Sequence, residues 1–297
     1  TMRTPTLVES LPVANTLGEG VLWHPAQQAV WWTDIQQCKL YRYRLADKDL
    51  QVWDTPDRLA CFGFIEGSEQ LIAAFDGGFA LYTPQTGERH WLSQPEYHLP
   101  NNRFNDGKVD RQGRFWAGTM VEQGEPQSID EQASVYSWGD SPCAVKHLAG
   151  FQITNGLCWS PDSRPAYLAD SPMGVYYAFD FDVASGSFSN RRIFATTPEG
   201  ISPDGSCVDA QGNVWNAQWG GNRVVCYSPQ GEVLQQLDVP VSQPTCVAFG
   251  GPDYSWLFVT SAREHLSATQ LEAEPQAGNL LIYRTDTEGL PADYFRG

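Results

Sequence analysis

The sequence predicts an all-β fold, a six-bladed β-propeller with four antiparallel strands in each blade. Short runs rich in Val, Ile, Trp and Tyr alternate with Gly, Pro and Asp, and long amphipathic helical patterns are absent. The strand patterns recur six times with a period of roughly 41 to 50 residues, which fits neither an eight-bladed ring nor a sandwich. Closed all-β folds of this length often form one domain, so we expect residues 1–297 to form a single propeller.

The repeat is clearest in its second strand, which combines apolar, aromatic and small residues. The six segments are AVWWTD (29–34), QLIAAFD (70–76), RFWAGT (114–119), PAYLADS (165–171), NVWNAQ (213–218) and SWLFVTS (255–261). A third strand containing tyrosine follows each: KLYRYRL (39–45), GFALYTP (78–84), SVYSW (134–138), GVYYAFDFD (174–182), RVVCYSP (223–229) and NLLIYRTD (279–286). Fourth strands are expected at 51–53, 88–92, 144–148, 191–195 and 232–238.

The sixth repeat ends after its third strand. TLVES (6–10) lies before the first repeat and can supply the missing outer strand. We therefore expect the N-terminal strand to close the ring, which leaves only short, protected sheet edges.

The repeat register predicts which residues face the central channel. The turns after the first strands align at His24-Pro25, Glu66-Gly67, Asp110-x-x-Gly113, Ser160-Pro161, Asp209-x-x-Gly212 and Gly250-Gly251. Five residues before these turns lie Glu19, Cys61, Asn105, Asn155, Asp204 and Thr245. The innermost strands of a propeller surround its axis, so these six positions should form a ring. Gly20, Gly156 and Gly205 follow three of them and are expected to permit tight backbone turns.

Glu19, Asn155 and Asp204 offer oxygen ligands from three blades. Such ligands suit one divalent cation, with Ca²⁺ as the first expectation and Mg²⁺, Mn²⁺, Zn²⁺ or Fe²⁺ as alternatives. The five histidines are dispersed, so a His-rich zinc site is not expected. The sequence contains no G-x-S-x-G elbow, P-loop or G-x-G-x-x-G motif. An enzyme built on this ring would use the metal as electrophile and a ring carboxylate as base.

Four segments resemble the signatures of the regucalcin/gluconolactonase/luciferin-regenerating-enzyme family. They are LGEGVLWHP (17–25), NNRFNDGKVDRQGRFWAGTM (101–120), ITNGLCWSPD (153–162) and PDGSCVDAQGNVW (203–215). The likeness extends from about residue 9 to the last blade. It implies a six-bladed propeller with one divalent metal in the channel and the hydrolysis of sugar-acid lactones, either aldono- or aldaro-lactones.

The resemblance also assigns roles to individual residues. It carries the metal ligands onto Glu19, Asn155 and Asp204, three positions that the repeat register had selected, and places Asp106 near the metal or its waters. The substrate-contacting residues fall on Arg103 and Asn105. Some members hold the sugar with an acidic pair after the GTM motif, where this chain has Glu122-Gln123, so Glu122 is also expected to contact the sugar. The resemblance favours Asp204 as the catalytic base, whereas the residues alone do not separate it from Glu19.

Other interpretations of these residues remain open. Arg103 can serve as an ion-pair partner of Asp106, and Asn105 as the cap of a turn. Residues 121–133 form either a surface loop or a lid. Structural roles are expected for two further sets: the turn aspartates Asp34, Asp110, Asp162, Asp170 and Asp209, and the inter-blade tryptophans Trp23, Trp32, Trp116, Trp159 and Trp215. A calcium-binding regulator, a scaffold without catalysis and a phosphotriester hydrolase are the alternative functions.

Composition limits the partners and the compartment. The net charge of −16 disfavours nucleic acid and anionic membranes as partners. The resemblance implies a small-molecule sugar lactone as the partner, and we expect a monomer or weak oligomer. The seven cysteines are scattered singly, are odd in number and form no C-x-x-C pair. This pattern favours reduced thiols and a cytoplasmic location.

Overall fold

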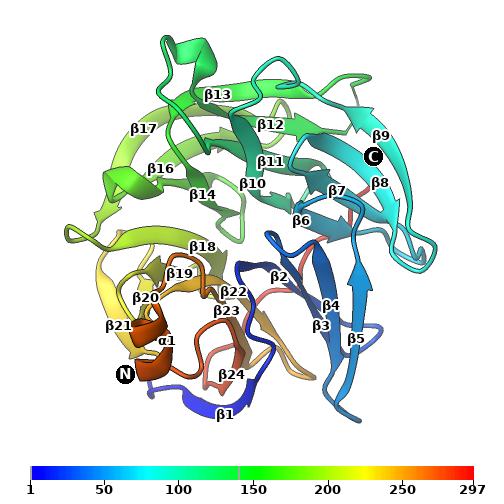
Figure 1. Cartoon of the computed structure of the whole chain (residues 1–297). Coiled ribbons are helices and arrows are strands. Elements are labelled where there is room, and N and C mark those ends of the chain that lie inside the picture. The colour runs from blue at the N-terminus through cyan, green and yellow to red at the C-terminus, as the bar shows by residue number, and fades with distance from the viewer. Residues whose placement is uncertain (1, 140) are drawn as a thin grey trace.

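The computed structural model describes residues 2–139 and 141–297 and confirms the six-bladed β-propeller (Figure 1). The first blade contains β2 (Gly18–His24), β3 (Ala29–Asp34), β4 (Lys39–Arg44) and β5 (Asp49–Asp54). The second contains β6 (Leu59–Phe64), β7 (Leu71–Phe75), β8 (Gly78–Thr83) and β9 (Glu88–Ser93). The third contains β10 (Asn102–Val109), β11 (Phe115–Val121), β12 (Ala133–Trp138) and β13 (Val145–Phe151).

The remaining blades repeat this order from the channel outwards. The fourth contains β14 (Thr154–Trp159), β15 (Pro165–Asp170), β16 (Val175–Asp182) and β17 (Ser187–Thr196). The fifth contains β18 (Ser202–Val208), β19 (Val214–Trp219), β20 (Arg223–Tyr227) and β21 (Val233–Asp238). The sixth contains β22 (Pro244–Gly250), β23 (Trp256–Ser261), β24 (Leu280–Arg284) and β1 (Thr6–Leu11).

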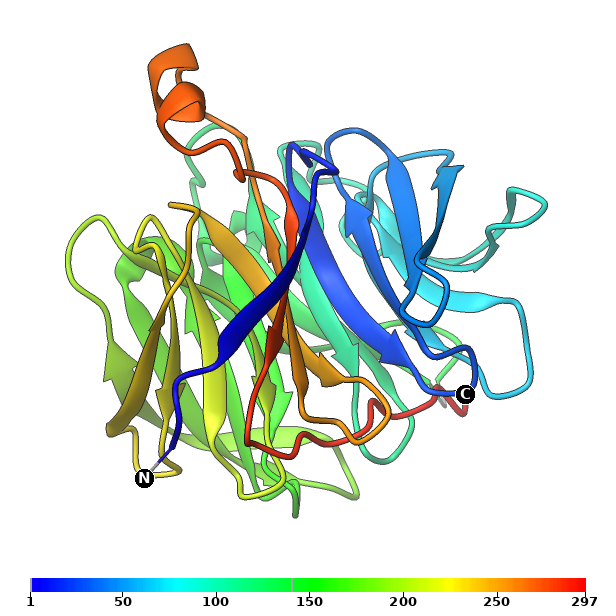
Figure 2. The same cartoon turned by 90° about the horizontal axis from the view of Figure 1, so that it is seen from below.

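The ring closes as the sequence predicts. β1 pairs antiparallel with β24 and forms the outer strand of the sixth sheet, so both ends of the chain contribute to one blade. In Figure 2 the blue N-terminal strand lies beside the red C-terminal strand. This pairing satisfies the edge that β24 would otherwise present to solvent.

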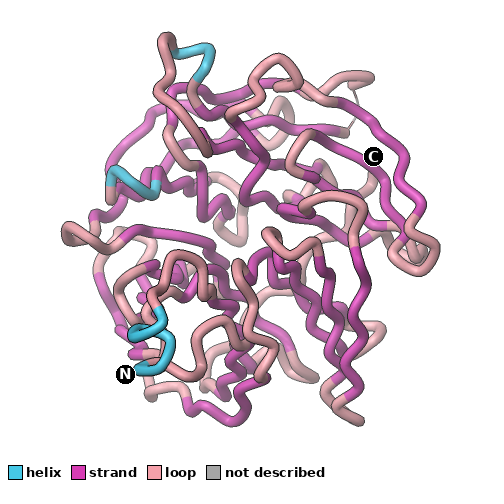
Figure 3. The backbone as a smooth tube through the Cα atoms, in the orientation of Figure 1, coloured by secondary structure: helices cyan, strands magenta, loops and turns pink. Residues whose placement is uncertain are grey.

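Helical structure is confined to short segments between strands (Figure 3). They are η1 (Ile129–Glu131), η2 (Ser171–Met173) and α1 (Ala268–Ala273). No helix within residues 2–139 and 141–297 has the length and apolar character needed to cross a membrane.

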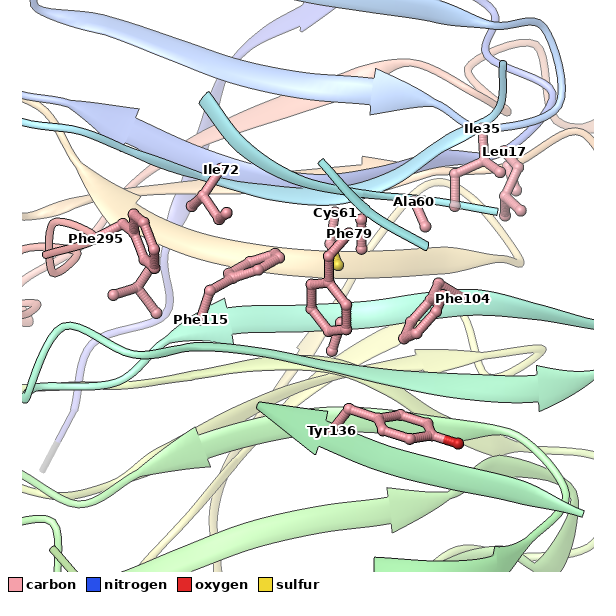
Figure 4. Close-up of a cluster of buried hydrophobic side chains, with 14 residues drawn as sticks. Leu17, Ile35, Ala60, Cys61, Ile72, Phe79, Phe104, Phe115, Tyr136 and Phe295 are labelled. Atoms are coloured by element: carbon pink, nitrogen blue, oxygen red, sulfur yellow. The ribbon is translucent and has the colours of Figure 1, made fainter. Parts of the chain in front are cut away.

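Aromatic side chains pack the blades against one another. The Phe79 ring of the second blade lies 5.0 Å from the Phe104 ring and 5.8 Å from the Phe115 ring of the third, measured between centroids (Figure 4). Both contacts are edge-on, the geometry that aromatic quadrupoles favour. The predicted packing of the tryptophans is also confirmed: Trp23, Trp32, Trp116, Trp159 and Trp215 are buried in the core.

Turn aspartates hold both ends of the inner strands. Asp110 accepts a hydrogen bond from the Trp116 indole at 2.7 Å, and Asp209 accepts the equivalent bond from Trp215 at 3.0 Å. Asp34 accepts a hydrogen bond from the backbone N–H of Leu17 (3.0 Å), and Asp170 accepts one from the backbone N–H of Ile153 (3.1 Å). Asp162 accepts a hydrogen bond from the Ser160 hydroxyl (2.6 Å). These bonds confirm the predicted structural roles and fix where the inner strands begin and end.

The C-terminal segment crosses the lower end of the channel, opposite α1 (Figure 2). The Phe295 N–H donates to the Phe64 carbonyl at 2.8 Å, and the Arg296 N–H donates to the Gly113 carbonyl at 3.0 Å. Upstream, the Ala210 N–H donates to the Glu288 carbonyl at 2.9 Å. The segment therefore closes one end of the channel, and the other end holds the larger cavity.

Candidate active site

A cavity of about 580 Å³ opens at the upper end of the channel, where the inner strands begin. Its lining includes all three predicted metal ligands, Glu19, Asn155 and Asp204. It also includes the three predicted substrate residues, Arg103, Asn105 and Glu122. Six residues from four blades thus reach one polar cavity, as the repeat register and the resemblance together predict.

Bulges in the inner strands place these side chains. The β2–β3 pairing shifts register between Glu19 and Leu22, and the β14–β15 pairing shifts between Asn155 and Cys158. Gly20 and Gly156 follow with φ of +63° and +66°, so glycine suits both positions. These two bulges turn the preceding polar side chains into the channel.

Gly205 requires a different explanation from the one that the sequence suggests. The β18–β19 pairing shifts register between Pro203 and Ser206, but Gly205 is not among the residues of positive φ, so the backbone irregularity there does not itself require glycine. A Cβ at Gly205 would lie 2.6 Å from the Cys246 sulfur and 2.8 Å from the Thr245 carbonyl oxygen. Close contact between the fifth and sixth blades is the reason for this glycine.

Glu19, Asp106 and Asp204 form a group of buried carboxylates, hereafter the carboxylate cluster. Glu19 is 4% exposed, and Asp106 and Asp204 are each 7% exposed. Backbone N–H groups donate to each of them: Gly20 to Glu19 (3.0 Å), Gly156 to Asp106 (2.8 Å) and Gly205 to Asp204 (2.9 Å). Asp106 also interacts with the backbone N–H groups of Gly107 and Leu157, but neutral N–H groups do not cancel the negative charge of three buried carboxylates.

Burial raises the pKa values of the three carboxylates in the cluster, and mutual repulsion adds to the shift at Glu19 and Asp204. Burial, followed by the charges of Asp204 and Asp106, raises the pKa of Glu19 well above its usual value. Burial, with a further contribution from Asp106, raises the pKa of Asp204 to about 8. Burial also raises the pKa of Asp106, although Lys108 opposes it. These carboxylates favour a bound positive charge because protons are otherwise needed to offset their repulsion.

Asn155 contributes an uncharged oxygen that also lacks a partner. Its Nδ2 donates to the Ser171 hydroxyl at 2.8 Å, which fixes the orientation of the amide. Its Oδ1 is buried and has no hydrogen-bond partner within residues 2–139 and 141–297. An orphaned carbonyl oxygen costs about 1–3 kcal/mol unless a ligand satisfies it. This oxygen and the carboxylate cluster fit a divalent cation that prefers oxygen ligands.

Cys246 is a neighbour of the cluster that the sequence interpretation missed. One potential ligand atom from each of Glu19, Asp106 and Cys246 lies within 4.8 Å of the others. Burial raises the pKa of the Cys246 thiol well above its usual value. Its only signal in the sequence is its place directly after the ring position Thr245. Cys61 and Thr245 also lie at ring positions but are absent from the lining of the upper cavity.

Arg58, Arg103 and Glu122 form one side of the cavity, hereafter the arginine wall. Glu122 accepts two bonds from Arg58, at 2.8 and 3.0 Å, and one from Arg103 Nε at 3.0 Å. Burial opposes ionisation, yet the bonds from Arg58 and the charge of Arg103 keep the pKa of Glu122 below its usual value. Arg103 thus pairs with Glu122, and the alternative pairing with Asp106 is wrong.

Both the oxygen and the nitrogen of the Asn105 side-chain amide make hydrogen bonds within the protein. Its Oδ1 accepts from Arg103 Nη1 (3.1 Å), and its Nδ2 donates to the Thr154 carbonyl (3.0 Å). These contacts position the amide between the arginine wall and the fourth blade. Gln123 lines the same cavity, while residues 124–133 do not, so the loop at 121–133 reaches the site only through its first residues.

Arg58 is another residue that the sequence interpretation missed, as are Glu264 and His265 in the lining of the same cavity. Arg58 lies just before β6 and contacts Asp76 (3.2 Å) and Gln36 (3.2 Å) in addition to Glu122. The repeat alignment gives no signal for it, because it lies outside the ring positions. Only the closure of the second blade against the third brings it to the cavity.

Comparisons with known proteins match this chain over most of its length. A family model described as the SMP-30/Gluconolactonase/LRE-like region matches residues 17–263. L-arabinolactonase of Azospirillum brasilense is 36% identical over 287 residues, covering 95% of this chain and 93% of the relative. 6-deoxy-6-sulfogluconolactonase of Pseudomonas putida is also 36% identical over 287 residues, covering 95% and 96%. A crystal structure of regucalcin from Agrobacterium tumefaciens, described as a calcium-binding protein, superposes with a TM-score of 0.91 at 31% identity and covers 98% of both chains.

Proposed function

The chain belongs to the SMP-30/Gluconolactonase/LRE-like family, and from this premise we propose that it is a metal-dependent lactonase that opens sugar-acid lactones. The observation that carries the proposal is the orphaned Asn155 Oδ1 beside the carboxylate cluster, at the floor of a polar cavity. Glu19, Asn155 and Asp204 would hold the cation directly. Asp106 would support it from beneath, since Asp106 belongs to the cluster but does not line the upper cavity.

The comparisons support both the lactonase activity and the bound cation in this proposal. Two relatives that cover nearly the whole chain are named as lactonases of sugar acids. The regucalcin structure is described as calcium-binding, which favours Ca²⁺ as the first candidate. The oxygen ligands also accept Mg²⁺ or Mn²⁺, and the neighbouring Cys246 thiol keeps Zn²⁺ and Fe²⁺ among the candidates.

The arginine wall would orient the lactone. Among the described residues, Nε and Nη1 of Arg103 have protein partners and Nη2 has none, which leaves that amino group for substrate oxygens. Glu122, held ionised by Arg58, would accept hydrogen bonds from sugar hydroxyls. Asn105 lies next to Arg103 and would contact the substrate oxygens nearer the ring. Fixed donors and acceptors of this kind lower the entropic barrier of the reaction.

The cation would supply Lewis-acid activation of the lactone carbonyl. Asp204 would take a proton from the attacking water while the water oxygen bonds to the carbonyl carbon. The ring C–O bond then breaks, and the proton passes from Asp204 to the departing ring oxygen, which leaves as a hydroxyl group. Asn155 cannot perform this step because an amide is not a base. No histidine occupies the six ring positions, and His265, which lines the cavity, has a side chain that is 77% exposed at the rim.

A second candidate function is calcium binding without catalysis, which the description of the regucalcin structure favours. The two functions differ in what the arginine wall is for. A calcium-binding protein has no need for Arg103 and Asn105 at the cavity, whereas a lactonase does. The same Lewis acid would also polarise a phosphotriester, so that substrate class belongs in the test.

The decisive experiment is a panel of aldono-lactones, aldaro-lactones and one phosphotriester, followed with a pH indicator. We expect acid release from sugar lactones that stops in chelator and returns when a divalent cation is restored. Asp162→Asn is the matched control, because Asp162 lies in a turn and bonds Ser160 outside the cavity. Cation binding without turnover of any lactone would favour the calcium-binding function. Turnover that survives complete metal removal would contradict the proposed chemistry.

A further inference from the structure

Glu264 lies in the connection between β23 and β24, residues 262–279, and lines the upper cavity. Three hydrogen bonds fix it in place. Its backbone N–H donates to the Thr16 carbonyl at 2.9 Å, and its own carbonyl accepts from Gln243 Nε2 at 2.9 Å. Its side-chain Oε1 accepts from Gln36 Nε2 at 2.8 Å. A carboxylate is therefore held firmly in the cavity lining, although it belongs to a long connection.

Hydrogen bonds link Glu264 to the arginine wall. Gln36, which donates to Glu264, accepts from Arg58 Nη1 at 3.2 Å, and Arg58 in turn binds Glu122. The charge of Glu264 also reaches Arg103: burial lowers the pKa of Arg103, and the charges of Glu122 and, to a smaller extent, Glu264 oppose that shift. Glu264 therefore belongs to the same polar side of the cavity as the arginine wall.

No lysine or arginine among the described residues pairs with Glu264. Both arginines of the arginine wall are already paired with Glu122, and one of them also with Asp76. The nearest basic group is His265, whose Nε2 lies 3.6 Å from Oε1 and whose side chain is 77% exposed. Oε2 of Glu264 accepts no hydrogen bond within the described part of the chain, and the side chain is 18% exposed. One oxygen of this carboxylate is thus free for a molecule in the cavity.

The charge of Glu264 is not needed to hold Gln36, because a neutral amide oxygen accepts the same bond. A fixed carboxylate with a free oxygen does two things to an incoming sugar. It accepts a strong hydrogen bond from a hydroxyl group, and it repels a second negative charge.

We propose that Glu264 is a specificity-determining residue, which binds a hydroxyl of an uncharged sugar lactone and disfavours lactones that carry a carboxylate. This inference rests on the proposed lactonase function and deepens it, because it favours aldono-lactones over aldaro-lactones. The arginine wall offers no compensating grip for a carboxylate, since Glu122 already occupies both of its arginines.

The alternative is that Glu264 only anchors residues 262–279 to the first blade. The two roles predict different results when the charge alone is removed. Loss of an anchor would impair every lactone in parallel. Loss of the charge would impair an uncharged lactone and improve a charged one.

The test compares an aldono-lactone with the aldaro-lactone of the same sugar and ring size. The two differ only in the terminal group, which is a hydroxymethyl group in the first and a carboxylate in the second. A pH indicator would give kcat/KM for both substrates in the wild type and in Glu264→Gln, which removes the charge but keeps an acceptor for Gln36. Gln243→Met removes a backbone anchor of Glu264 and keeps its charge. Glu272→Gln is the control, because Glu272 is exposed on α1 in the same connection and does not line the cavity.

We expect the wild type to prefer the aldono-lactone. In Glu264→Gln, kcat/KM should fall about fivefold for the aldono-lactone, the scale of a hydrogen bond to a charged group, and should rise for the aldaro-lactone. The preference for the aldono-lactone should shrink by about tenfold or more, because like charges no longer meet in the cavity. Gln243→Met and Glu272→Gln should keep the wild-type preference, and elemental analysis should show the same metal content in Glu264→Gln as in the wild type.

A preference that stays unchanged in Glu264→Gln, including a parallel loss on both lactones, would overturn the role of Glu264 while leaving the lactonase function intact. A wild type that prefers the aldaro-lactone would do the same. A wild type that opens no sugar lactone would overturn the lactonase function and this inference together.

Discussion

Arg58 and Glu122 form a two-point ion pair across the boundary between the second and third blades. Nη1 of Arg58 lies 2.8 Å from Oε2 of Glu122, and Nη2 lies 3.0 Å from Oε1. The same Oε2 accepts from Arg103 at 3.0 Å. Parallel bonds of this kind fix direction as well as distance. The pair therefore determines how Glu122 and Arg103 face the cavity.

Replacing Arg58 should impair substrate binding without affecting the metal. In Arg58→Met, Glu122 loses two of its three charged bonds, and Arg103 loses a fixed partner. We expect KM for the preferred lactone to rise about tenfold, with little change in the Kd for Ca²⁺. Steady-state kinetics and calorimetry would measure the two effects. Arg44→Met, at an exposed arginine paired with Asp47, is the control and should leave both constants unchanged. A metal Kd that weakens in parallel would contradict a role confined to the substrate.

Arg103→Ala should have a larger effect on the substrate than Arg58→Met. Arg103 is 4% exposed and donates to Glu122, Asn105 and the Phe104 carbonyl, so its loss disturbs the whole arginine wall. We expect KM to rise, kcat/KM to fall by about 10² and metal content to remain intact. Elemental analysis of the purified variant would measure the metal. Loss of metal equal to the loss of activity would assign Arg103 a structural role.

Asp204→Asn tests the assignment of the base. Asparagine retains an oxygen ligand but cannot accept the proton of water, so the variant should keep some metal and lose about two to four orders of magnitude in kcat. The measurement is kcat at saturating metal, with metal content determined on the same sample. Near-normal turnover in the metal-loaded variant would move the proton acceptor to Asp106 or to another group.

The metal-free protein should become less stable as pH rises. The pKa of Asp204 is raised to about 8, and that of Glu19 is also raised. The folded state then binds more protons than the unfolded state between about pH 4 and pH 8, so stability falls across this interval. A bound cation replaces those protons. Thermal melts in chelator should show Tm falling toward pH 8, and added Ca²⁺ should raise Tm more at pH 8 than at pH 5. A larger metal effect at pH 5 would contradict the raised pKa values.

The ring positions were predictable because each lies five residues before the turn that ends the first strand of its repeat. Once the turns were aligned, Glu19, Asn155 and Asp204 fell at one register position, and the structure brings all three to one cavity. The alignment also selected Cys61 and Thr245, which do not line that cavity. Register determines the blade and the height in the channel, but bulges decide how far each side chain enters it.

The sequence by itself determined the six blades, their strand order and the closure by β1, because strand patterning and turn residues are local signals. Tertiary structure decided the partners of the charged groups. Arg58 meets Glu122 only because two blades pack side by side, and Cys246 meets Glu19 only because the sixth blade returns to the first. The small lower cavity is bounded on one side only because the C-terminal segment crosses the channel. Contacts between residues distant in the chain depend on ring closure, which no local pattern encodes.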